Sequence, residues 1–152
     1  MTDTDAGRFT IGVFQDAAWA ERGLDALMRA GLLPESLSIV AVGTPAVEAL
    51  IAKALPWAPD RLELPGLGLA LIAGPIARAL HGTSNDLAVH GLAGTMRRIG
   101  YQSHDARIFD ALVARGGVLV AVHSEPRAAD ALAVFHAYGG GNAAIGAWTG
   151  RV

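Results

Sequence analysis

The sequence of 152 residues predicts a single α+β domain. One segment in the first third of the chain and one in the last third each have the pattern strand, helix, strand. Two such units are typical of the ferredoxin-like split βαβ fold, a four-stranded antiparallel sheet with two helices on one face. Roughly seventy residues separate the units, far more than an ordinary connection. We therefore expect one domain over residues 1–152 with a helical, glycine-rich insertion at 44–115.

The first unit begins with residues 9–14, where β-branched and aromatic side chains alternate as in a strand. Asp16 then provides a carboxylate that can cap a helix. Apolar residues follow helical spacing over 17–30, and Gly31 ends that helix. Residues 38–42 form the second strand of the unit.

The insertion opens with a short helix at residues 44–55, which begins with a threonine and a proline. A proline-rich loop occupies 56–60, and an apolar, glycine-studded segment follows over 64–80. Two further helices are predicted near 86–98 and over 103–115, because apolar residues recur there at helical spacing. We expect these pieces to form a helical subdomain.

The second unit begins with an apolar strand at residues 118–122. Ser124 and Pro126 then open a helix whose apolar side chains form one stripe. Three glycines at 139–141 end that helix, and residues 143–148 are predicted to form the final strand.

The apolar segment at residues 64–80 leaves three interpretations open. It is too apolar for a solvated linker, and it is too short and too interrupted by Pro75 to cross a bilayer. It packs inside its own domain, or forms part of a homo-oligomer interface, or, least favoured, contacts a membrane surface. Its larger side chains are the candidate interface residues: Leu67, Leu69, Leu71, Ile72 and Ile76.

The composition excludes several classes of function. Lys and Arg number 12 against 14 Asp and Glu, and Arg97-Arg98 is the sole basic doublet, so nucleic acid is not an expected partner. The absence of cysteine rules out disulfides, thiolate zinc sites and cysteine nucleophiles. The first residues are polar and acidic, unlike a secretory signal, so we expect a cytoplasmic protein. The hydrophobic share of 52% suggests that part of the surface faces a second copy.

Few residues point to chemistry. The histidines are not spaced as metal ligands, so no metal site is predicted. The glycines at 139–141 come after a predicted helix, whereas the glycines of a dinucleotide-binding fingerprint come before one, so no cofactor is predicted. His104, Asp105 and Arg107 open a predicted helix, and His123 ends a predicted strand. These four are the candidate pocket residues, because a carboxylate beside an imidazole can orient a general base. Capping and solvation are the plainer roles for His104 and Asp105.

Several motifs along the chain resemble a bacterial general-stress-protein domain family. They are an opening strand with its Asp16-led helix, the elements Leu64-Pro-Gly-Leu-Gly68 and Ala73-Gly-Pro75, and Arg115-Gly-Gly117 before an apolar strand. The resemblance implies a small stress-induced bacterial protein of undefined biochemical role, and it implies no catalytic residues.

Three functions therefore stand as expectations from the sequence. The first is a non-catalytic, stress-related binding or structural module that acts as a homo-oligomer. The second is a small enzyme or ligand sensor with a pocket between the sheet and the inserted helices. The third is a peripheral membrane-surface protein.

Overall fold

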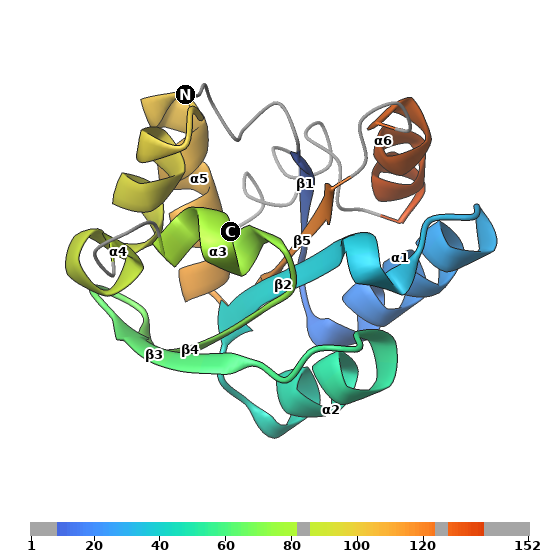
Figure 1. The fold of residues 1–152 in the computed structure, drawn as a ribbon, viewed down its shortest axis with the longest axis horizontal. Coiled ribbons are helices and arrows are strands. Elements are labelled where there is room, and N and C mark those ends of the chain that lie inside the picture. The colour runs from blue at the N-terminus through green and yellow to red at the C-terminus, as the bar shows by residue number, and fades with distance from the viewer. Residues whose placement is uncertain (1–8, 82–85, 124–127, 139–152) are drawn as a thin grey trace.

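The computed structural model describes residues 9–81, 86–123 and 128–138, and shows an α+β fold (Figure 1). Five strands form one antiparallel sheet in the order β1-β5-β2-β4-β3. Their bounds are β1 Phe9–Phe14, β2 Leu37–Val42, β3 Asp60–Leu64, β4 Gly68–Ala73 and β5 Val118–His123.

Helices cover both faces of this sheet (Figure 1). One layer consists of α1 (Ala17–Arg29), α2 (Pro45–Ala54) and α6 (Ala128–Ala137). The opposite layer consists of α3 (Ile76–His81), α4 (Asp86–Arg98) and α5 (Ser103–Ala114). A 3-10 turn at Pro34–Ser36 leads from α1 into β2.

The first unit of the prediction is confirmed, with strand β1, helix α1 and strand β2 in the expected places. Because β5 pairs antiparallel with both β1 and β2, those two strands run parallel to each other with β5 between them. Within the described residues the sheet has five strands: three of the four predicted ones and the hairpin β3–β4, which the insertion contributes and which pairs through β4 with β2. The insertion is therefore not purely helical. The predicted strand at residues 143–148 lies outside the described residues.

Coverage of both faces explains why the central strands are continuous apolar runs. In β2, β4 and β5 neighbouring residues point to opposite faces, and both faces are packed against helices. Ile72 of β4 joins the core beneath α3, α4 and α5, whereas its neighbour Leu71 joins the core beneath α1, α2 and α6. The large hydrophobic share of the sequence thus fills two cores within one chain.

The apolar segment at residues 64–80 packs mainly within its own fold. Leu71, Ile72 and Ile76 are each 0% exposed, so their side chains are not available to a second copy. Leu67 is partly buried against the core beneath α3. Of the five candidate interface residues, Leu69 alone is substantially exposed, at 42%. None of the helices in the described part of the chain has the length and apolar character that a membrane span requires.

Local signals in the sequence fix the starts of two helices. The Asp16 carboxylate accepts a hydrogen bond from the Trp19 amide at 2.9 Å and so caps α1, as predicted. The hydroxyl of Thr44 accepts from the Val47 amide at 3.1 Å and caps α2 in the same way.

A buried contact joins the insertion to the first unit at the end of β4. Gly74 has a φ of +103° and packs directly against the backbone of Ser38 at the start of β2. The fully buried hydroxyl of Ser38 accepts a hydrogen bond from the Ile76 amide at 3.0 Å. The Ile76 amide lies at the start of α3, where an amide has no carbonyl partner within the helix, and the bond to Ser38 satisfies it. The direction of α3 is therefore set by β2.

Candidate functional site

A cleft of about 940 Å³ opens at one end of the sheet. It lies where β1, β2 and β3 begin and where β4 and β5 end. A volume of this size is typical of small-molecule sites. The lining residues are Phe9, Glu35, Trp57, Ala58, Asp60, Ile72, Ala73, Gly74, Pro75, Ala77, Arg78, Ala79, Arg98 and His123.

Two arginines enter the cleft from the layer of α3 and α4. Arg98, the last residue of α4, donates hydrogen bonds from Nη2 to the carbonyl oxygens of Ala79 and Leu80, the latter at 3.2 Å. These bonds satisfy carbonyl groups near the carboxyl end of α3, where a positive charge is favourable. Arg78 lies on α3 itself, is exposed, and makes no hydrogen bond or ion pair with any residue that the structure describes.

Two carboxylates line the cleft near the starts of β2 and β3. Glu35 lies in the 3-10 turn between α1 and β2, and Asp60 is the first residue of β3, after α2. Next to Asp60, the Arg61 guanidinium donates two hydrogen bonds to Glu48 of α2, at 2.8 and 2.9 Å. These bonds hold the pKa of the Glu48 carboxyl below its ordinary value and tie the start of β3 to α2.

Aromatic rings stand at two places in the lining. Trp57, in the loop between α2 and β3, is 42% exposed, which is unusual for so large an apolar side chain. At the other side, the rings of Phe9 and His123 stack with their centroids 4.9 Å apart. Tyr101 fixes this corner, because its hydroxyl donates to the Phe9 carbonyl oxygen at 3.1 Å. Burial raises the pKa of the Tyr101 hydroxyl.

The lining combines groups of both charges with an aromatic surface. Among the described residues, the side chains of the lining that can act as a nucleophile or a base are the carboxylates of Glu35 and Asp60 and the imidazole of His123. Within the described ranges no group of three or more His, Asp or Glu side chains is placed to hold a metal ion. The lining instead combines two arginines, two carboxylates, an imidazole and an exposed indole.

The structure separates the four pocket residues that the sequence suggested. His123 lines the cleft at the end of β5. His104, Asp105 and Arg107 are exposed in the first turns of α5 and do not line it. His104 and Arg107 are three positions apart and share one face of α5, whereas Asp105 points roughly 100° away from His104 around the helix.

Sequence reasoning missed most of the charged lining, namely Glu35, Asp60, Arg78 and Arg98. These residues belong to four separate elements, and only the folded sheet brings them to one edge. One signal was present, since Arg98 belongs to the basic doublet Arg97-Arg98 at the predicted end of a helix.

Comparisons of this chain with protein-family models, with curated proteins and with solved structures give no match. The function is therefore argued from the geometry of the cleft.

Proposed function

We propose that this protein is a non-catalytic ligand-binding module, which binds a small polar molecule in the cleft at the end of the sheet. The observation that carries the proposal is the cleft itself, a space of about 940 Å³ where charged side chains and an exposed indole meet. Ligand sites are concave, partly apolar, and supplied with a few polar groups that fix orientation.

The position of the cleft supports the proposal. Its floor consists of strand ends in a sheet that is packed on both faces, so the lining is held by rigid elements. This is the ligand-sensor alternative of the sequence analysis, with the pocket between the sheet and the inserted helices. The ferredoxin-like topology belongs to the same proposal, and the arrangement of β1 and β2 on either side of β5 supports it. A role in the stress response and a cytoplasmic location rest on the sequence alone.

The homo-oligomer alternative has less support. Its main argument was an apolar surplus in the segment 64–80, and most of that surplus is buried within the same chain. Leu69 alone among its candidate residues is available for contact with another molecule.

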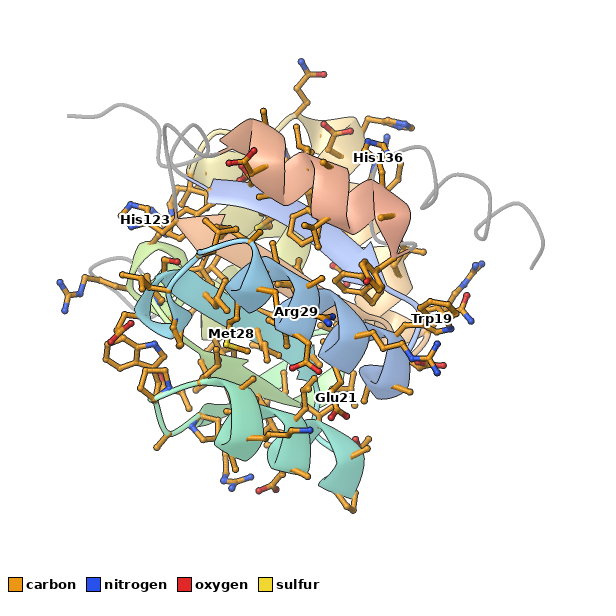
Figure 2. All side chains as sticks on the ribbon, turned by 90° about the vertical axis from the view of Figure 1, so that its right-hand side faces the viewer. Trp19, Glu21, Met28, Arg29, His123 and His136 are labelled. Atoms are coloured by element: carbon orange, nitrogen blue, oxygen red, sulfur yellow. The ribbon has the colours of Figure 1, made fainter. Side chains whose placement is uncertain are left out.

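Protein-observed NMR with a library of small carboxylates, amines, amides and amino acids tests the proposal. We expect the signals that shift to gather on the cleft, with the Trp57 indole among them. The matched control is Trp19, which is 38% exposed on α1 and lies across the molecule from His123 (Figure 2). Trp57→Ala is expected to weaken binding and Trp19→Ala to leave it unchanged. Hits scattered over the surface, or equal effects of the two variants, would refute the proposed function.

A further inference from the structure

The two arginines and Glu35 reach the cleft from opposite layers of the fold. Arg78 and Arg98 belong to the helices α3 and α4 on one side of the sheet. Glu35 stands in the turn between α1 and β2 on the other side. Asp60 begins β3 opposite Ile72 of β4, so its side chain leaves the sheet on the side of α3 and α4. We call the side of the arginines the basic wall and the side of Glu35 the acidic wall.

The charges of Glu35 and Arg78 do not pair with each other in the structure. Glu35 and Arg78 form no ion pair with any residue in the described ranges. Elsewhere opposite charges of this chain do pair, as Glu48 and Arg61 do on the nearby surface. The cleft therefore keeps a carboxylate and a guanidinium apart on opposite walls.

The basic wall is partly preorganised. The hydrogen bonds from Arg98 to the carbonyl oxygens of Ala79 and Leu80 fix its guanidinium against the helix that carries Arg78. A guanidinium offers planar N–H groups that match a carboxylate or phosphate. Arg78, exposed and next to Ala79 in sequence, lies on the same short helix. An anionic group at this wall is held by one fixed and one adjustable arginine.

The sign of the two walls limits what fits between them. A singly charged ligand pairs with the wall of opposite charge, but its charge then lies near the like charge of the other wall. A ligand with both charges pairs with both walls, and an apolar portion between them can lie against Trp57 and Pro75, which also line the cleft.

We propose that the ligand carries an anionic and a cationic group joined by an apolar portion, as in an amino acid or another small zwitterion. Arg78 and Arg98 bind its anionic group, and Glu35 binds its cationic group. This inference rests on the proposed function, because it names the class of molecule that the same cleft takes.

A series of probes with one ring and different charges tests it. The zwitterion is para-(aminomethyl)benzoate, the anion para-toluate, the cation para-methylbenzylamine and the neutral compound para-toluamide. Each is titrated at neutral pH and low ionic strength, and the shift of the Trp57 indole signal gives Kd. We expect the zwitterion to bind roughly fivefold tighter than either singly charged probe, as one additional solvent-exposed ion pair allows.

Four variants assign the walls. Arg78→Gln is expected to bring the affinity for the zwitterion closer to that for para-methylbenzylamine, with Arg98 retaining part of the contact to the anionic group. Glu35→Gln is expected to reduce it to that for para-toluate. The matched controls Arg107→Gln and Glu63→Gln remove exposed charges of the same kind outside the cleft lining, and are expected to change nothing. Circular dichroism confirms that each variant is folded.

The outcomes separate this inference from the proposed function. If para-toluate or para-methylbenzylamine binds in the cleft as tightly as the zwitterion, the inference is wrong and the cleft remains a binding site. The same holds if library fragments gather in the cleft but no probe of this series does. Equal losses in Arg78→Gln and Arg107→Gln also overturn it, because they reveal an effect of net charge. If nothing gathers in the cleft, both proposals fail.

Discussion

Replacing Gly74 by alanine tests whether the insertion is locked to the first strand–helix–strand unit at the end of β4. A Cβ on Gly74 would lie 2.6 Å from both Cα and Oγ of Ser38, and it would also meet the carbonyl oxygen of Leu37. Most of these atoms belong to the backbone of β2, which cannot move without disturbing the sheet. Gly66 is the matched control, because its φ is +80° and a Cβ there meets nothing within 4 Å.

The expected free-energy changes follow from this difference. A left-handed alanine costs about 1–2 kcal/mol, and the smaller entropy of its unfolded chain offsets about 0.4–1 kcal/mol of that. Gly66→Ala is therefore expected to lower the free energy of unfolding by about 1 kcal/mol. Gly74→Ala adds an overpacking cost of about 1–3 kcal/mol, so its total loss is about 2–4 kcal/mol.

Urea denaturation of the two variants, followed by circular dichroism, measures this comparison. For a domain of this length the larger loss corresponds to a decrease in Tm of roughly 10 °C. If the two variants differ by less than about 1 kcal/mol, overpacking contributes too little, and the close contact between Gly74 and β2 does not exist as described.

Three further predictions concern burial in the same fold. Ser38→Ala removes the acceptor of the buried Ile76 amide and should lower the free energy of unfolding by about 1–3 kcal/mol; a neutral effect in urea titration would contradict that bond. Burial raises the pKa of Tyr101, so above pH about 10 the unfolded chain ionises first and stability falls as pH rises. Across that pH range the urea midpoint should fall less steeply with pH in Tyr101→Phe than in the unmodified protein. Equal slopes in the two proteins would contradict the burial of this hydroxyl. Ile72→Ala should cost about 2–5 kcal/mol and Leu69→Ala less than about 1 kcal/mol, because Ile72 is buried and Leu69 is 42% exposed. Similar losses in thermal denaturation would place both residues on the surface or both in the core.

The elements with local signals were predictable from the sequence. Asp16 caps α1 through a hydrogen bond within four residues of chain, and the alternation in residues 9–14 marks β1, so both appear in the pattern. The hairpin β3–β4 was not predictable in this way. Its second strand is apolar on both faces and contains small residues, and periodicity alone does not separate such a strand from a buried helix.

The candidate site was predictable only in part. His123 ends an apolar strand, and the end of a strand is a local property, so it was found. Glu35 and Arg78 are 43 positions apart in the sequence, and each looks like an ordinary surface charge. Their shared cleft depends on the order of strands in the sheet, which residue patterns do not contain.

The strand order also bears on how the chain folds. β5 lies second in the sheet but is the last described strand in the chain, and among the described strands it is the one that pairs with β1. More than a hundred residues, from 14 to 118, separate the end of β1 from the start of β5. During synthesis β1 is therefore made long before the strand that pairs with it. α1 contacts β1 early in synthesis, but until β5 exists the amides of β1 have no partner among the described strands, which leaves this stage open to wrong association. Formation of the complete sheet is consequently a late and non-local event, with the slow kinetics that such pairings bring.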